Sequence, residues 1–221
     1  SKWLEEAAHA SHLGKFVDHI QRIGYPFPEI KPQIDRQTAF QRLQIEQTTK
    51  KLILIAAQDL SNQRKGTSLI LEAFIMGMLP KCSILTIGEK INVNNPEIRQ
   101  LGFIKDPELL RCAYTCADVF CLPSLEENLA QTGIESLSEG TPVVCFSNTG
   151  PCDYVKDHLT GITCVDRSPV ALSQAIQKCL ADKHLTDKSY VRNEFRHQHE
   201  IKYSEAIIKK QYEDLYVKLL M

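Results

Sequence analysis

The sequence predicts an α/β fold in which a doubly wound, Rossmann-like parallel sheet carries helices on both faces. Between residues 50 and 185, short apolar segments alternate with helical segments of about ten residues. The apolar segments are hydrophobic at nearly every position, which is typical of parallel strands buried on both faces. Asp106-Pro107 suits the start of a helix, and Gly140 suits a helix stop. Together these observations favour one domain over this region.

The pattern places the elements of this domain in a definite order. The expected strands are residues 51–57, 83–88, 98–104, 118–123, 142–146 and 161–165. The expected helices are residues 67–79, 106–117, 131–140 and 168–181. In such a sheet the loops that follow the strands share one edge, and ligands bind outside that edge. Candidate functional residues are therefore sought in the loops after the strands.

Additional segments flank the domain on both sides. Residues 1–12 favour a helix and residues 15–23 a strand with partial alternation. An extended linker with three prolines is expected over residues 24–33, and a short helix over 36–43. Residues 186–220 favour one broken or two successive amphipathic helices.

These segments divide the chain into three parts. Residues 1–49 are interpreted as the end of a preceding domain and an interdomain linker, residues 50–185 as the Rossmann-like domain, and residues 186–221 as C-terminal helices. The sequence starts at Ser1 without an initiator Met. We therefore expect the chain to be a piece of a longer protein.

Composition excludes several classes of function. The formal net charge of −1 gives no basic surface for nucleic acid. No apolar run approaches the roughly 20 residues that span a bilayer, and no secretory signal is recognised. The eight cysteines form no CxxC pair. Reduced thiols in a cytoplasmic protein are therefore favoured over a zinc site or a disulfide framework.

The loop after the first expected strand carries Arg64, Lys65 and Gly66 directly before a helix. Backbone N–H groups at a helix N-terminus attract anions, and Gly66 allows a ligand to approach the backbone closely. Lys65 adds a positive charge, so the combination predicts an anion site, most naturally for phosphate. A solvated basic loop explains the same residues, and the stretch matches neither GxGxxG nor GxxxxGK[ST].

Two carboxylates, Glu127 and Glu135, follow a buried strand. Glu127 lies in a polar loop and Glu135 lies early in the next helix, whose start presents the backbone N–H groups of residues 128–131. Acids beside a phosphate need hydrogen-bond donors, and the vicinal hydroxyls of a sugar are such donors. A catalytic acid/base pair and ordinary surface charge are the alternatives for these two residues. Glu126 and Glu139 are interpreted as surface acids.

Two further stretches face the same edge of the expected sheet. Phe103-Ile104 is an apolar segment with free backbone groups that could receive a flat base, and Asn148-Thr149-Gly150 is a turn after the strand expected over residues 142–146. Taken alone, the first stretch is explained better by a plain strand end and a capped helix, whereas a simple strand–helix connection explains the second equally well.

Taken together, these stretches resemble the C-terminal, donor-binding half of a retaining GT-B glycosyltransferase of glycosyltransferase family 4, also called group 1. The motifs follow the family's order: RKG at 64–66, LGFIKD at 101–106, ADVFCLPSLEEN at 117–128, EGTPVV at 139–144 and TG at 149–150. Each motif is weak alone, whereas the ordered combination is specific. The first 50 residues resemble the end of the family's acceptor-side domain and the interdomain linker.

The resemblance implies transfer of a sugar, with retention of configuration, from a nucleotide diphosphate-sugar such as a UDP- or GDP-sugar. Lys65 would contact the diphosphate, Glu127 the hydroxyls of the transferred sugar, and Glu135 the ribose. Lys65 and Glu127 are then the catalytic residues. The other implied donor contacts are Arg64, which assists at the diphosphate, Gly66, Phe103, Ile104, Asn128, Leu129, Ala130 and Gln131. Neither a cofactor nor a metal is expected.

The resemblance also implies the remaining partners. The acceptor would be a glycan or a lipid-linked molecule, used in polysaccharide or cell-envelope synthesis and bound largely by the N-terminal domain. Family members work in the cytoplasm, often as peripheral proteins at the inner face of the membrane. Because most of the acceptor-side domain is missing, we expect this chain to bind nucleotide with little or no turnover.

The sequence departs from the family pattern at three positions. Many members carry an arginine on the diphosphate where this chain has Asp59, so Arg64 is expected to replace it. Asn128 and Ala130 stand where the family has glycines, which would narrow the sugar pocket. A non-catalytic nucleotide- or sugar-binding module with a decayed donor site is the alternative. A nucleotide-sugar epimerase on the same architecture is a third, less favoured hypothesis.

Overall fold

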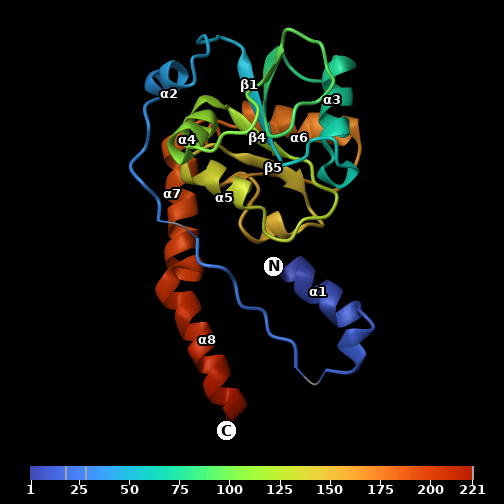
Figure 1. Ribbon diagram of the computed structural model, residues 1–221, viewed down its shortest axis with the longest axis vertical. Helices are drawn as coiled ribbons and strands as arrows, with labels where there is room; N and C mark the ends of the chain where they lie inside the picture. Colours follow the sequence, from blue (N-terminus) through green and yellow to red (C-terminus); the bar gives the residue numbers. More distant parts are fainter. Residues whose placement is uncertain (18, 28, 221) are drawn as a thin grey trace.

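The computed structural model describes residues 1–17, 19–27 and 29–220. A six-stranded parallel sheet forms its centre, with strand order β3-β2-β1-β4-β5-β6 (Figure 1). The strands are β1 (Lys51–Ala56), β2 (Cys82–Ile87), β3 (Ile98–Gln100), β4 (Val119–Leu122), β5 (Val143–Phe146) and β6 (Gly161–Cys164). The chain builds one half of the sheet outward from β1 and the other half outward from β4. The predicted doubly wound fold is therefore confirmed.

Helices cover both faces of this sheet (Figure 1). One face carries α3 (Thr67–Ile75) and α6 (Pro169–Ala181), which pack against each other. The other face carries α4 (Pro107–Cys116) and α5 (Gln131–Ser138), flanked by α2 (Arg36–Arg42) and α7 (Lys188–Gln198). Asp106 caps α4 by accepting a hydrogen bond from the amide of Glu108 at 2.9 Å. Gly140 follows α5 with φ +78°, as expected for a helix stop.

The strands bury their side chains on both faces. Ile53, Leu54, Phe120 and Val144 have no exposed surface, and each such burial contributes about 1.5–3 kcal/mol. All eight cysteines are free thiols, as expected, and seven of them are buried. Burial raises the pKa of Cys82 to about 11 and that of Cys116 to about 12, so these thiols act as core residues.

The strand predicted over residues 15–23 is wrong for the part that the structure describes. Lys15 ends a 3-10 turn, η1 (Leu13–Lys15), and residues 16–17 and 19–23 have no regular secondary structure. Phe16 and Val17 are exposed and pair with no edge of the sheet. A partially alternating segment needs a neighbouring strand to become a strand, and no described strand lies beside this one. The helix before it, α1 (Lys2–Ala10), is confirmed.

The third strand is also shorter than predicted, because β3 ends at Gln100 and not at residue 104. Gly102 adopts φ +69°, a left-handed conformation that breaks the extended backbone. The backbone nevertheless stays beside the sheet, because the amide of Gly88 donates to the carbonyl of Gly102 at 3.0 Å. The segment after β3 is thus a loop that remains at the carboxyl edge.

The C-terminal part forms two successive helices, as one of the two expectations proposed. A π-helical turn, η4 (His199–Tyr203), separates α7 from α8 (Glu205–Leu220), which extends away from the sheet (Figure 1). The linker is held against these helices because the ring of Phe27 stacks on Tyr203 at a centroid distance of 4.0 Å. None of the helices within the described residues is long and apolar enough to cross a membrane.

Lys188, in the first turn of α7, connects this helix to the end of α4 by hydrogen bonds. Its ammonium donates to the carbonyl oxygen of Ala117 at 2.7 Å and to the hydroxyl of Thr141. Burial, with a smaller effect of the nearby Arg36 guanidinium, lowers the pKa of Lys188 to about 7. Between about pH 7 and pH 10.5, which is the ordinary pKa of lysine, Lys188 therefore binds fewer protons in the folded protein than in the unfolded chain.

Stability is accordingly expected to increase with pH in this interval. Relative to a Lys188→Met variant, the free energy of unfolding of the native protein should rise by about 2 kcal/mol between pH 7 and about pH 9. Urea unfolding at a series of pH values measures this difference. A difference that does not change with pH would show that the ammonium remains fully charged in the folded state.

Candidate functional site

The two halves of the sheet meet between β1 and β4, whose residues pair in parallel at Ile53↔Val119 and Leu54↔Phe120. The chain leaves β1 toward β2 and leaves β4 toward β5, in opposite directions along the sheet. A crevice forms outside the carboxyl ends of two such strands. The loop after β1 carries the RKG motif, and the loop after β4 carries Glu127. This switch point therefore places two of the predicted motifs together.

The two loops are in direct contact. The amide of Leu125 donates to the carbonyl of Arg64 at 2.8 Å, and the Arg64 guanidinium donates to the carbonyl of Glu126 at 3.2 Å. Gly66 has φ +64°, and a Cβ at this position would lie 1.9 Å from the carbonyl oxygen of Pro123. Only glycine fits this close crossing of the two backbones. Because Lys65 directly precedes Gly66, this crossing holds Lys65 next to the loop after β4.

Lys65 and Glu127 form an ion pair with a distance of 2.7 Å between Nζ and Oε2. Only 13% of the Glu127 side chain and 25% of the Lys65 side chain is exposed. The Glu127 carboxylate also accepts from the amide of Asn128 at 3.2 Å and from the hydroxyl of Ser124 at 3.5 Å. The structure thus brings the two predicted catalytic residues into contact and holds the carboxylate in a defined position.

The start of α5 lies four residues after Glu127. Ala130 precedes the helix with φ +51° and ψ +83°, and no side chain caps the first N–H groups. The carbonyl of Ala130 accepts a hydrogen bond from the buried Tyr154 hydroxyl at 2.9 Å. This hydrogen bond helps to hold Ala130 in its left-handed conformation. The N-terminal end of α5 is electropositive and suits an anion. Ala130, which stands where the family has a glycine, therefore adopts the left-handed backbone conformation that a glycine would adopt more easily.

Glu135 lies on α5 and forms neither a hydrogen bond nor an ion pair with Lys65 or Glu127 among the described residues. Its Oε2 accepts a hydrogen bond from the Tyr114 hydroxyl at 2.9 Å. Burial, and then the charge of Glu135, raise the pKa of Tyr114 well above its ordinary value, so Tyr114 stays a donor. A hollow of about 470 Å³ is lined by Glu135, Leu129, Gln131 and residues of the linker. The carboxylate is therefore positioned while it still faces open space.

The segment predicted to receive a base lies in the next loop along the edge. Phe103 is 60% exposed, and Ile104 packs partly against the core. A smaller hollow of about 180 Å³ joins Glu135 to Pro107 and Leu110 at the start of α4, just after this segment. Neither Phe103 nor Ile104 lines the two hollows beside Glu135, so the structure does not join the predicted base segment to the predicted ribose site.

Asp59 is engaged by hydrogen bonds within its own loop. Its carboxylate accepts from the amide of Ser61 at 2.9 Å and from the hydroxyl of Ser61 at 2.6 Å, and these bonds lower the pKa of Asp59. The acid therefore closes a local turn. Arg64 is the cationic side chain that the same loop directs toward Glu126, on the side where the two loops cross.

Glu139, which was expected to be a surface acid, is buried. Only 4% of its side chain is exposed, and it forms an ion pair with Arg111 at 2.5 Å between Oε1 and Nε. The expectation failed because the partner comes from α4, a different helix of the same face. Glu126 is exposed, as expected. The turn at Gly150 does face the site, since its amide donates to the carbonyl of Glu127 at 2.8 Å.

Sequence reasoning missed two tyrosines that position the site. Tyr114 holds Glu135, and Tyr154 lies beneath the start of α5, where a Cβ on Gly133 would meet its hydroxyl at 2.4 Å. No motif marks either tyrosine, because both act through hydrogen bonds to residues on other elements. Within the described residues, no cluster of three or more His, Cys, Asp or Glu side chains could hold a metal ion. That the active protein uses no metal ion remains a prediction.

The sheet order and the fold of the matching solved structures show that the chain has the architecture of a GT-B domain. The family described as Glycosyl transferases group 1 matches residues 35–197, and the chain belongs to this family. It is 30% identical over 142 residues to D-inositol 3-phosphate glycosyltransferase of Corynebacterium urealyticum. That alignment covers 63% of this chain and 32% of the relative, so the chain spans about a third of that protein.

Solved structures share the fold at low sequence identity. A glycosyltransferase from Rickettsia africae superposes with a TM-score of 0.79 at 15% identity, covering 100% of this chain and 62% of that one. Anabaena HepE, solved in complex with UDP-glucose, superposes with a TM-score of 0.66 at 14% identity. This alignment covers 83% of the present chain and 52% of HepE. The likeness establishes the architecture.

Proposed function

We propose that this chain is the donor-binding half of a retaining glycosyltransferase of family 4 that uses a nucleotide diphosphate-sugar. The observation that carries the proposal is the Lys65–Glu127 pair at the switch point, next to the uncapped start of α5. An ammonium and a helix N-terminus suit a diphosphate, and carboxylates suit sugar hydroxyls. UDP-glucose bound to HepE, a protein of the same fold, supports a UDP-sugar as the donor.

In the proposed reaction the protein stabilises the leaving nucleotide diphosphate by electrostatics. Lys65, Arg64 and the N–H groups at the start of α5 would bear the charge that develops on the diphosphate. Lys65 would exchange its contact with Glu127 for the diphosphate, which frees Glu127 to accept hydrogen bonds from the sugar. Glu135 would accept from the ribose hydroxyls. The two acids are thus ligands of hydroxyl groups and not the acid/base pair of a glycosidase.

The acceptor is expected to be bound by the full-length enzyme. We propose a glycan or a lipid-linked acceptor, in polysaccharide or cell-envelope synthesis, and a cytoplasmic enzyme that works at the inner face of the membrane. A GT-B active site lies between two domains, so this chain is expected to bind donor with little turnover. The proposal of retention is tested with the full-length enzyme, by determining the anomeric configuration of the product by NMR.

Calorimetric titration of this chain with UDP, GDP, ADP and UDP-glucose tests donor binding. We expect Lys65→Ala to weaken binding of UDP and of UDP-glucose about tenfold, because one charge-assisted contact to the diphosphate is lost. Glu135→Ala should weaken binding of all the nucleotides through the ribose. Lys178→Ala is the matched control, since Lys178 is an exposed lysine of α6. Binding that Lys65→Ala leaves unchanged would contradict the proposed site.

A second candidate function is a non-catalytic module with a decayed donor site. The observation that favours it is Asp59, which occupies the family's usual arginine position and is engaged with Ser61. The same titration separates the two candidates. If none of the nucleotides binds measurably, the module is favoured over the transferase.

A further inference from the structure

Phe27 is a buried aromatic residue of the linker, with only 5% of its surface exposed. Its amide donates to the carbonyl oxygen of Tyr203 at 3.0 Å, and its own carbonyl oxygen accepts from Nε2 of His199 at 3.1 Å. Both partners belong to the π-helical turn η4. The backbone of the linker is therefore fixed at Phe27, and the ring of this residue has a defined position.

The ring of Phe27 belongs to an aromatic cluster that includes Tyr154. It stacks with Tyr203 and with Phe195, at centroid distances of 4.0 and 5.8 Å. It meets the Tyr154 ring edge to face, with a centroid distance of 6.0 Å and an interplanar angle of 89°. Aromatic pairs in this geometry attract each other, and the attraction depends on the relative orientation of the rings. Removing the Phe27 ring is therefore expected to change the position of Tyr154.

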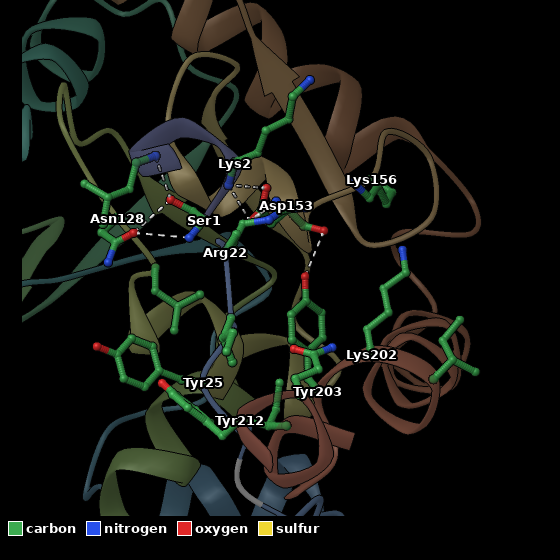
Figure 2. Close-up of a pocket in the computed structure, with 17 residues that line it drawn as sticks. Ser1, Lys2, Arg22, Tyr25, Asn128, Asp153, Lys156, Lys202, Tyr203 and Tyr212 are labelled. Atoms are coloured by element: carbon green, nitrogen blue, oxygen red, sulfur yellow. Dashed lines mark hydrogen bonds and ion pairs between the residues drawn. The ribbon is translucent and has the colours of Figure 1, made fainter. Parts of the chain in front are cut away.

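A second contact joins the same segments. The Tyr203 hydroxyl donates to the carbonyl oxygen of Asp153 at 3.5 Å, as Figure 2 shows. Asp153 is the last residue of the 3-10 turn η3 (Gly150–Asp153) and directly precedes Tyr154. Tyr203, the residue on which Phe27 stacks, thus also contacts the segment that carries Tyr154. The position of Tyr154 therefore depends on the linker and on η4.

Tyr154 contacts the start of α5, where the proposed diphosphate site lies. Burial raises the pKa of Tyr154 well above its ordinary value, so its hydroxyl stays protonated and can donate. The carbonyl oxygen of Ala130 accepts from this hydroxyl at 2.9 Å and from the amide of Gly133 at 3.0 Å. Ala130 has φ +51° and precedes the uncapped N–H groups of α5. Moving the Tyr154 hydroxyl would therefore release the residue that shapes this helix start.

We infer that Phe27 is a positioning residue for the donor site. Its packing against Tyr154 directs the Tyr154 hydroxyl to Ala130, and this hydrogen bond holds the left-handed backbone that presents the first N–H groups of α5 to the diphosphate. The linker thus sets the donor affinity through two buried side chains. The effect on affinity rests on the proposed function, because it assumes that a nucleotide diphosphate binds at this helix start.

A double-mutant cycle on UDP binding tests this inference. Calorimetry compares the native chain with Phe27→Leu, with Tyr154→Phe and with the double variant. We expect each single variant to bind UDP about fivefold more weakly, because each loses the directed hydrogen bond to Ala130. The double variant should also be about fivefold weaker, whereas independent effects would multiply to about 25-fold. A general loss of packing does not produce this non-additivity.

Phe40→Leu is the matched control, because Phe40 is a phenylalanine on α2 that is only 3% exposed. We expect this variant to be less stable but to bind UDP as the native chain does. A second measurement needs no nucleotide. The amide ¹H–¹⁵N NMR resonances of residues 131–133 should shift in Phe27→Leu and in Tyr154→Phe, but not in Phe40→Leu. Phe27→Met, which keeps most of the buried volume, replaces Phe27→Leu in both measurements if that variant does not fold.

The possible outcomes separate the inference from its alternatives. Phe27 also lines the hollow beside Glu135, so direct contact with the nucleotide is the main alternative. Effects that multiply to about 25-fold would favour direct contact and overturn the inference. UDP binding that is unchanged in Phe27→Leu, or equally weakened in Phe40→Leu, would also overturn it. If the native chain does not bind UDP, the proposed function fails, and the resonances of residues 131–133 then decide alone: a shift in Phe27→Leu supports the positioning role, and unchanged resonances refute it.

Discussion

Replacing Arg111 by Met is expected to lower the free energy of unfolding by about 3–5 kcal/mol. The Arg111 guanidinium is the ion-pair partner of the buried Glu139 carboxylate, at 2.5 Å. The remaining contact of that carboxylate is a weak hydrogen bond from Thr115 at 3.4 Å. Methionine would fill much of the same space but would leave the buried carboxylate without its ion-pair partner. Urea denaturation followed by circular dichroism measures the loss.

The double variant Arg111→Met/Glu139→Gln distinguishes the charge effect from lost packing. Without the buried charge, we expect most of the stability to return, because removing both charges of a buried pair is often nearly neutral. Arg196→Met serves as a control, since Arg196 is exposed on α7, and should change the stability by less than about 0.5 kcal/mol. A double variant as unstable as Arg111→Met would show that the side-chain volume, and not the charge, is decisive.

The fold of the central domain could be predicted because the pattern that indicates each strand lies within a short segment of the sequence. Six apolar segments in the predicted order become six strands, and a buried parallel strand has to be apolar along its whole length. The meeting of Lys65 and Glu127 also follows from the pattern. Once β1 and β4 are neighbours, the loops after them share the carboxyl edge. The ordered motifs identified which residues of these loops matter.

The features that sequence reasoning missed depend on partners distant along the chain. Glu139 resembles any acid near a helix end until α4 brings Arg111 against it. Tyr154 reaches the carbonyl of Ala130 from a different loop, and Tyr114 reaches Glu135 from a different helix. Hydrogen bonds of this kind leave no periodicity in the sequence. The strand expected over 15–23 failed for a related reason, since its formation requires a neighbouring strand.

Replacing Gly150 by Ala is expected to damage both stability and donor binding. A Cβ at this position would lie 1.4 Å from the carbonyl oxygen of Asn128 and 2.3 Å from its carbonyl carbon. Both atoms belong to the backbone, so no side-chain rotation relieves the overlap. The Gly150 amide also donates to the carbonyl of Glu127, so the loop that carries Glu127 has to move. We expect a loss of about 2–3 kcal/mol in the free energy of unfolding.

The same movement would displace Glu127 from Lys65, and for this reason we expect UDP-glucose to bind about tenfold more weakly to Gly150→Ala than to the native chain. Gly24→Ala is a suitable control because the nearest atom to its added Cβ is the flexible end of the Ile208 side chain, at 3.3 Å. Calorimetry and urea denaturation of both variants measure the two effects separately. A destabilised Gly150→Ala protein that binds UDP-glucose normally would mean that the loop after β4 does not contribute to the donor site. The proposed role of Glu127 would then be wrong, whereas the fold would be unaffected.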